Sequence, residues 1–293
     1  MKKTALLSLL LALTIIKAFA YTEVPGFNGP TWQDYRETIT EGSGTESSPY
    51  LIRTPGQLAQ LAYDVNYGND GNGDSKEGVH YQLAADISLD KREDGKRVLW
   101  VPIGLSDSKL FKGTLTNPDG HVIEKMMIDV TSTATTQYIG LFGCLQGTVD
   151  GIRIAGDSEI RLSNGGNYEA GLLCGNNDEY SYVNNCRVEN SYITGKNFSS
   201  TTKIGGLVGS NNTFGENGRM TSCIVTNVTI KLEGNGTPTV NAGGVVGESY
   251  GKVLDCHALM LNMTATNFST SNDSYLGGVI GLVRGGQIGR AHV

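Results

Sequence analysis

The chain has 293 residues, of which 23 are lysine or arginine and 29 are aspartate or glutamate, so its formal net charge is −6. This acidic balance argues against nucleic acid or anionic lipid as a partner, because both attract basic proteins. Forty glycines against seven prolines, together with many β-branched residues, favour many short strands joined by tight turns over a helical protein.

The first twenty residues have the layout of a secretory signal peptide. Two lysines precede an apolar run at residues 5–16, and an Ala-x-Ala triplet ends at Ala20. The run is shorter than the ~20 residues that a membrane-spanning helix needs, and no second run follows. We expect residues 1–20 to be a signal peptide cleaved after Ala20. Its removal takes away three lysines and leaves an exported chain with a net charge of −9 and no transmembrane helix.

A short linker and a helical cap are expected before the repeats. Residues 21–43 read as an N-terminal linker, and residues 44–130 as a cap with the first rungs of a repeat structure. Thr54 as N-cap, Pro55 at the first helical position and Gln57 three residues after the cap predict a helix start. Apolar residues at helical spacing follow until Gly68, which predicts the helix end. Strand-like pieces follow at residues 81–89, 99–103 and 121–130.

A glycine motif recurs five times within residues 131–287. The copies are Ile139-Gly140-Leu141-Phe142-Gly143, Ala170-Gly171-Leu172-Leu173-Cys174, Gly205-Gly206-Leu207-Val208-Gly209, Gly243-Gly244-Val245-Val246-Gly247 and Gly277-Gly278-Val279-Ile280-Gly281. Counted from a shared central glycine at 140, 171, 206, 244 and 278, the copies are 31, 35, 38 and 34 residues apart. Spacings in this range indicate a solenoid, a propeller or an array.

The segments between the copies select among these architectures. They are short and alternate in polarity, without the helix of leucine-rich, ankyrin or tetratricopeptide repeats. Both tryptophans, Trp32 and Trp100, precede the repeats, so a Trp-Asp propeller signature is missing. We predict an all-β fold: a right-handed parallel β-helix with about three strands per turn and a small N-terminal helix-containing cap. The glycines would shape sharp turns and close backbone contacts, and the two aliphatic residues would contribute one side chain to the interior.

Five cysteines in an exported chain raise the question of disulfides. Cys186, Cys223 and Cys256 occupy matching positions of the repeat, so stacking would place them in one column, while Cys144 and Cys174 lie in or beside the glycine motif. We interpret them as buried thiols that act as small hydrophobic residues. A disulfide stays open as an alternative. No C-x-x-C or Cys/His spacing supports a metal site.

The chain contains an ordered series of phrases: Ser48-Pro49-Tyr50-Leu51-Ile52, Gln57-Leu58-Ala59-Gln60-Leu61-Ala62, Ala85-Asp86-Ile87-Ser88-Leu89, Val101-Pro102-Ile103-Gly104, Phe111-Lys112-Gly113 and the glycine motifs. This series resembles proteins with GLUG-motif repeats, which are common among exported and surface proteins of gut Bacteroidetes. The second motif departs from the pattern, because Cys174 replaces the closing glycine and Gly175 follows, which indicates a shifted turn. The resemblance implies an adhesin-like β-helical protein at the surface of a Gram-negative bacterium, without an assigned chemistry.

The last residues, 288–293, read as Ile-Gly-Arg-Ala-His-Val, which is similar to an in-frame translation of a sequencing adapter. We expect this segment to be a non-native tail, and the chain to be a fragment whose native sequence continues differently after Gln287.

Two short motifs with possible chemistry are better explained as structure. Ser249 stands in a G-x-S-x-G phrase, but a nucleophile elbow needs a strand before the serine and a helix after it, and residues 252–256 read as another strand. Residues 70–74, Asp-Gly-Asn-Gly-Asp, open like a calcium loop. They then depart from it, with Ser75 in place of glycine and Tyr81 in place of glutamate. We therefore expect no metal site and no cofactor.

A ligand surface is the remaining functional hypothesis. Tyr168, Tyr180, Tyr182 and Tyr192 fall around one repeat, and aromatic surfaces with amides suit sugars and proteins alike, although these rings could instead only fix a loop. We predict a structural or adhesive protein, not an enzyme, that binds an extracellular glycan or protein through loops between rungs. The alternative is a carbohydrate-active β-helix enzyme, a polysaccharide lyase or hydrolase, which carboxylates clustered with Arg or Lys in one groove would favour.

Overall fold

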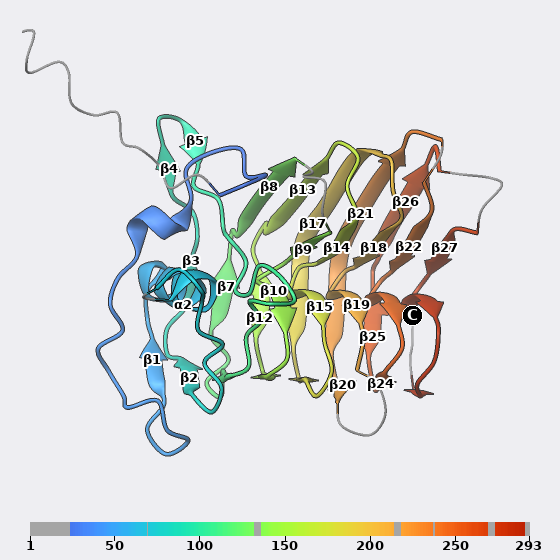
Figure 1. The fold of residues 1–293 in the computed structure, drawn as a ribbon. Coiled ribbons are helices and arrows are strands. Elements are labelled where there is room, and N and C mark those ends of the chain that lie inside the picture. The colour runs from blue at the N-terminus through green and yellow to red at the C-terminus, as the bar shows by residue number, and fades with distance from the viewer. Residues whose placement is uncertain are drawn as a thin grey trace, which may run out of the picture.

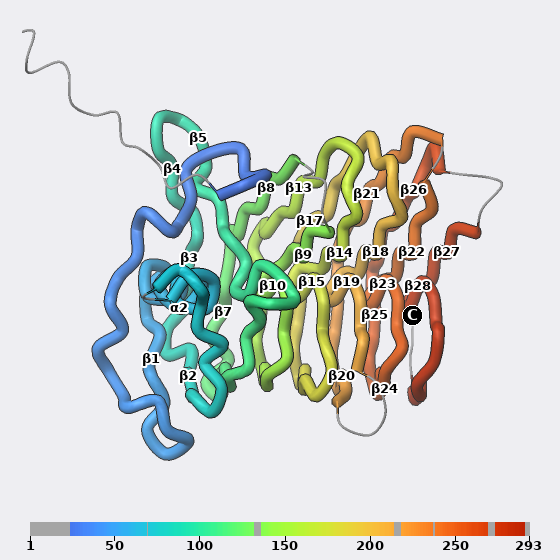
Figure 2. Tube along the Cα trace, viewed as in Figure 1, coloured from blue at the N-terminus to red at the C-terminus, as the bar shows by residue number. Residues whose placement is uncertain are grey.

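Each repeat forms one turn of a right-handed parallel β-solenoid, and about seven turns are stacked along its axis. The computed structural model describes residues 24–68, 70–131, 136–213, 218–236, 238–268 and 273–290. Successive turns lie side by side from the blue N-terminal end to the red C-terminal end (Figures 1 and 2). The expected right-handed parallel β-helix with a helix-containing cap is thus confirmed. The expected signal peptide lies outside the described residues.

Two large parallel sheets run the length of the solenoid. The eight-stranded sheet has the order β1 (Tyr50–Ile52), β2 (His80–Leu83), β6 (Thr114–Thr116), β11 (Thr148–Asp150), β16 (Tyr182–Asn184), β20 (Arg219–Thr221), β24 (Lys252–Leu254) and β29 (Ile288–Gly289). The nine-stranded sheet contains β3 (Ile87–Ser88), β7 (Val122–Glu124), β8 (Met127–Thr131), β12 (Arg153–Ala155), β13 (Glu159–Ser163), β17 (Arg187–Phe198), β21 (Ile224–Gly234), β25 (His257–Leu259) and β26 (Asn262–Thr266).

Two five-stranded parallel sheets complete each turn. The first, named the β9 sheet, contains β9 (Gln137–Ile139), β14 (Tyr168–Gly171), β18 (Thr202–Gly205), β22 (Val240–Gly243) and β27 (Tyr275–Gly277). The second, named the β10 sheet, contains β10 (Phe142–Leu145), β15 (Cys174–Asn177), β19 (Val208–Asn211), β23 (Val246–Ser249) and β28 (Ile280–Val283). A separate antiparallel pair joins β4 (Arg92–Glu93) to β5 (Lys96–Arg97).

A turn contains more strands than the three that we expected. The turn from β11 to β15 has five strands, and the next has four, because the counterparts of β12 and β13 are joined in the long β17. The glycine motif causes the difference. It does not form a simple turn but supplies the end of a strand in the β9 sheet and the start of a strand in the β10 sheet.

The register corrects how the second motif aligns with the others. Gly171 pairs with Gly205, not with the central Gly206 that the spacing count had matched to it. Cys174 pairs with Val208, so Gly175 takes the place of the closing glycine and lies level with Gly209. The prediction of a shifted turn at Cys174 is therefore wrong: the second copy keeps register with the third, and the first copy is one residue shorter between Gly140 and Phe142.

The N-terminal helix is confirmed at the predicted residues. Helix α2 spans Pro55–Tyr67, the Thr54 hydroxyl accepts a hydrogen bond from the Gln57 backbone N–H at 3.1 Å, and Gly68 follows with φ 58°. The buried Asn66 fixes the helix to the first turns, because its side-chain amide donates to Pro102 O at 2.9 Å and accepts from Gly104 N at 2.9 Å. The helix thereby adds its apolar face to the hydrophobic core at the N-terminal end (Figure 1).

Part of the expected linker is packed against the solenoid. A short 3-10 helix, η1, spans Trp32–Tyr35, and Trp32 is buried in the hydrophobic core. Thr31 forms a parallel β-bridge with Leu99, within the second of the strand-like pieces expected before the repeats. The described part of residues 21–43 therefore belongs to the cap.

The interior is mainly aliphatic but also contains small polar groups. Both aliphatic residues of a glycine motif are buried, for example Leu207 and Val208, whereas we had expected one to face inward. All five cysteines are free and buried, which answers the open question of disulfides. Cys186, Cys223 and Cys256 each precede residues that pair in register, so they form the predicted column.

The interior is open at the C-terminal end. Leu276, Val283 and Ile288 stack on fully buried residues of the preceding turn, yet they are 53%, 45% and 42% exposed. Residues 288 and 289 of the expected tail form β29, and residues 291–293 lie outside the described part of the chain. In the described ranges, no helix is long and apolar enough to cross a membrane.

Candidate functional site

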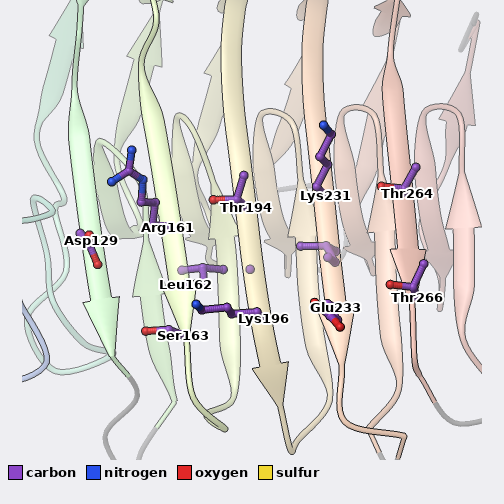
Figure 3. A pocket seen from close by; sticks show the side chains of 12 residues that line it. Asp129, Arg161, Leu162, Ser163, Thr194, Lys196, Lys231, Glu233, Thr264 and Thr266 are labelled. Carbon is purple, nitrogen blue, oxygen red and sulfur yellow. The ribbon is translucent and has the colours of Figure 1, made fainter.

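The best candidate site is a shallow groove on the outer face of the nine-stranded sheet. It has a volume of about 560 Å³ and crosses β8, β13, β17, β21 and β26. Figure 3 shows its labelled side chains in two rows that run across the neighbouring strands. The first row consists of Asp129, Arg161, Thr194, Lys231 and Thr264, and the second of Ser163, Lys196, Glu233 and Thr266.

Strand alternation creates both rows. Ile160, Ile193 and Ile230 pair with one another and point into the core, so the next residue on each strand must point outward. The residues two positions further along face outward again, which gives the second row. The groove is therefore a consequence of stacking, and each turn contributes side chains at equivalent positions.

The ring of Phe198 packs on the interior side of the groove floor, beneath Gly195. A Cβ added to Gly195 would overlap the Phe198 ring, with Phe198 Cε2 at 2.9 Å, so the ring fills the space under this glycine. Phe198 also contacts Tyr168 edge-on at 5.8 Å and stacks on Phe268 at 6.0 Å between ring centroids. This aromatic cluster spans neighbouring turns and packs beneath the groove.

The charges of the groove differ in how far they are neutralised. Arg161 donates two hydrogen bonds to Glu159, at 2.7 and 2.8 Å, and this pairing raises the pKa of Arg161. Glu233 accepts a hydrogen bond from the Asn267 amide at 3.2 Å. Lys196 and Lys231 are exposed, and within the described ranges neither ammonium has a carboxylate partner. Two free cations therefore face solvent in the groove.

Of the four tyrosines expected to form a ligand surface, Tyr192 lies beside the groove. It pairs with Glu159 on β13 and Thr229 on β21, in the outward row next to Arg161 and Thr194, and 42% of it is exposed. Tyr180 and Tyr182 lie at the corner that leads into the eight-stranded sheet, where Arg219 stands 5.6 Å from the Tyr182 ring centroid. The structure therefore does not bring the four rings together.

The prediction that Tyr168 belongs to the ligand surface is wrong, because this side chain is buried. Its ring is 1% exposed and packs in the core, and its hydroxyl donates to Ser163 O at 2.8 Å. Residue 168 faces inward because it alternates with the outward Glu169 on β14. Its role is to support the groove from below through Phe198.

The G-x-S-x-G phrase around Ser249 and the Asp-rich residues 70–74 both have structural roles. Ser249 is fully buried at the end of β23, its hydroxyl donates to Gly251 O at 3.2 Å and accepts from the Asn211 amide at 3.0 Å, and strand β24 follows. Asp70 accepts two hydrogen bonds from Asn72, at 3.0 and 2.9 Å, so its carboxylate closes a local turn. In the part of the chain that the structure describes, no three His, Cys, Asp or Glu side chains are grouped as metal ligands.

A second charged cluster lies where the β9 and β10 sheets meet; this place is named the crease and is defined by Glu169, Lys203 and Asn241 of the β9 sheet and Glu248 of the β10 sheet. Lys203 stands 3.0 Å from Glu169 and 3.1 Å from Glu248, and the Asn241 amide donates to Glu248 at 2.6 Å. Burial raises the pKa of Glu169, and Lys203 offsets only part of this. Burial alone would lower the pKa of Lys203, but the two carboxylates outweigh it and raise that pKa. Arg284 also stands 3.5 Å from Glu248, so this network joins the two sheets and extends to the segment after β28.

The sequence interpretation missed the groove residues, although a signal for them exists. Four segments align at the same phase of the repeat: Glu159-Ile160-Arg161-Leu162-Ser163, Tyr192-Ile193-Thr194-Gly195-Lys196, Thr229-Ile230-Lys231-Leu232-Glu233 and Asn262-Met263-Thr264-Ala265-Thr266. Each alternates outward polar and inward apolar residues. Alignment of these segments, instead of the glycine motifs alone, would have indicated one continuous polar face.

Comparison with known proteins establishes the fold but not the function. No family model matches the sequence. A protein of Evansella cellulosilytica that is named a Gly-rich membrane protein is 34% identical over 150 residues, which cover 50% of this chain and 15% of that protein. A crystal structure of a Bacteroides ovatus protein, assigned by name only to the immunoglobulin A1 proteases, superposes with a TM-score of 0.52 and 16% identity, covering 87% of this chain and 67% of that chain. The chain therefore shares a β-helix architecture with the longer Bacteroides ovatus protein, at an identity that concerns the fold alone. It spans 15% of the length of the Evansella cellulosilytica protein.

Proposed function

We propose that this protein is an exported, surface-displayed β-helix of the GLUG-repeat type that binds an extracellular glycan. The observation that carries the proposal is the outer groove, in which exposed cations, carboxylates and hydroxyls lie beside the Tyr192 ring. Surface display is supported by the signal-like residues 1–20 and by the name of the Evansella cellulosilytica relative. The binding residues are on strand faces, not in the loops between rungs where the sequence had led us to expect them.

The chemistry of the groove suits a sugar chain better than a protein partner. Sugars present hydroxyl groups that both donate and accept hydrogen bonds, and the groove offers acceptors, donors and hydroxyls in alternation. The exposed ring of Tyr192 gives a flat apolar surface for the C–H face of a sugar. A protein partner would need a larger buried apolar centre, whereas nine of the twelve residues that line the groove are polar or charged.

Replacement of Tyr192 by alanine is expected to weaken glycan binding roughly fivefold, since loss of an aromatic contact costs about 1 kcal/mol. Ligands would be selected on a glycan array and their affinity measured by calorimetric titration. Tyr180→Ala is the matched control, because Tyr180 is 56% exposed but lies at another corner of the turn. Equal loss in both variants, or no glycan bound by the wild type, would contradict the proposal.

A carbohydrate-active enzyme is a second candidate, favoured by one specific observation. Glu233 shares the groove with Lys196 and Lys231, a carboxylate beside cations as a lyase would need. Asp129 lies three strands away, about 14 Å at about 4.8 Å per strand, which is too far for a hydrolase pair with Glu233. Incubation of the wild type with bound glycans, followed by chromatography of the products, tests this candidate. Fragments released by the wild type but not by Glu233→Gln would establish catalysis, and intact glycan would leave binding alone.

A further inference from the structure

The cations of the groove follow the solenoid axis. Arg161 lies on β13, Lys196 on β17 and Lys231 on β21, so three consecutive strands each contribute one positive side chain. Neighbouring strands in a sheet are about 4.8 Å apart, so the cations advance by about this distance per turn along the axis. Lys196 is displaced from Arg161 and Lys231 by two residues along its strand, into the second row. A polymer that crosses the strands would meet one cation per turn.

In the described part of the chain, two of these cations lack the carboxylate partner that several other lysines have. Lys76, Lys112 and Lys125 have carboxylate partners at 2.7, 3.8 and 3.5 Å. Lys196 and Lys231 have no such partner among the described residues, although Glu233 is the in-register neighbour of Lys196. Both are thus free to bind an external anion, even though the chain as a whole is acidic.

We infer that the groove binds an extended polysaccharide whose sugars carry carboxylate groups, with the sugar chain running across the strands along the solenoid axis. One sugar ring advances such a chain by a distance close to the strand spacing, so successive carboxylates could meet Arg161, Lys196 and Lys231 in turn. This inference rests on the proposed glycan-binding function and adds the charge and the direction of the ligand.

The rest of the groove favours a sugar over other polyanions. Asp129 and Glu233 would repel a densely charged phosphate backbone, and nucleic-acid binding normally requires a net basic surface. The same carboxylates accept hydrogen bonds from sugar hydroxyls, and Thr194, Thr264 and Thr266 add donors and acceptors on adjacent strands. The ligand that fits therefore combines spaced negative charges with many hydroxyl groups.

The test uses the full chain and matched pairs of polymers. Polygalacturonate and alginate carry free carboxylates, and their fully esterified forms keep the sugar backbone without the charge. Affinity electrophoresis would compare the wild type with Lys196→Gln/Lys231→Gln, and with Lys112→Gln/Lys125→Gln as a control that removes the same charge from paired lysines elsewhere. All are surface substitutions and should leave the melting temperature nearly unchanged.

The wild type is expected to bind at least one free-acid polymer, and to bind its ester about tenfold more weakly. The groove variant Lys196→Gln/Lys231→Gln should bind the free acid about tenfold more weakly than the wild type does, and the control variant less than twofold more weakly. Raised salt should weaken the binding of the acid polymer. Equal binding of acid and ester would overturn the carboxylate inference while leaving glycan binding intact. A groove variant that binds like the wild type would overturn the assignment of the lysines. Failure of every glycan on the array would remove the proposed function itself.

Discussion

Gly209→Ala is expected to destabilise the fold by more than about 3 kcal/mol, or to prevent the protein from folding to a soluble state. The added Cβ would lie 2.7 Å from Glu169 C and from Gly175 O, and closer still to Ala170 N. All three atoms belong to backbone, so no side-chain rotation can relieve the overlap. Chemical denaturation measures the change, and for a chain of this size the melting temperature should fall by roughly 6–12 °C.

Two other glycine-to-alanine variants serve as controls. They separate the steric overlap at Gly209 from the effect of an added methyl group in open space and from backbone strain. A Cβ on Gly285 would meet its nearest atom, Tyr250 O, at 3.7 Å, so Gly285→Ala should change stability by less than about 0.5 kcal/mol. Gly71 has open space around it but a φ of +83°, so Gly71→Ala should cost about 1 kcal/mol from backbone strain alone. If Gly209→Ala costs no more than Gly71→Ala, the β9 and β10 sheets do not approach as closely as described.

Lys203→Met is expected to destabilise the fold by about 3 kcal/mol, because it leaves two carboxylates without their shared cation. Glu248 and Glu169 side chains are 4% and 14% exposed, and Lys203 is the cation within 3.1 Å of both. Methionine keeps most of the length and apolar volume of the lysine stem, so the change tests charge more than packing. The free energy of unfolding at neutral pH is the measurement.

Lys112→Met is the matched control for this charge effect. Lys112 stands 3.8 Å from Glu77, whose side chain is 76% exposed, and exposed pairs of this kind contribute less than about 1 kcal/mol. Equal effects of Lys203→Met and Lys112→Met would show that the crease is open to water and that its ion pairs do not join the two sheets.

Much of the fold could be predicted because its determinants are local. The cap of α2 depends on Thr54, Gln57 and Gly68, which act within one turn of the chain. The period of the glycine motif reports the length of one turn of the solenoid, and alternation within the segments reports strands. The column of Cys186, Cys223 and Cys256 followed from the period alone.

Other features depend on contacts between turns and could not be derived from spacing. The one-residue offset of Gly171 becomes visible when β14 pairs with β18, because the third motif offers two adjacent glycines, Gly205 and Gly206, as possible matches. Corners that use the left-handed region carry Asn190 and Asn227, with φ 48° and 50°, and their side chains bond to each other at 2.7 Å. A single asparagine in the sequence does not distinguish such a corner from any polar loop.

The candidate site also depends on contacts between turns, which sequence spacing alone does not predict. Tyrosines close in sequence were expected to form one surface, but consecutive sheets of a turn face different directions, so Tyr182 and Tyr192 lie on different sheets. Residues about 35 positions apart, such as Arg161 and Lys196, lie on adjacent strands instead. In a solenoid a binding surface runs along the axis, across turns, and is composed of residues one repeat apart.

A crystal structure of the protein with an oligosaccharide of the polymer that it binds tests this account most directly. The account predicts sugar density on the outer face of β13, β17 and β21, extended along the axis, with contacts to Lys196, Lys231 and the Tyr192 ring. Density in the crease between the β9 and β10 sheets, or at the Tyr180 and Tyr182 corner, would contradict it.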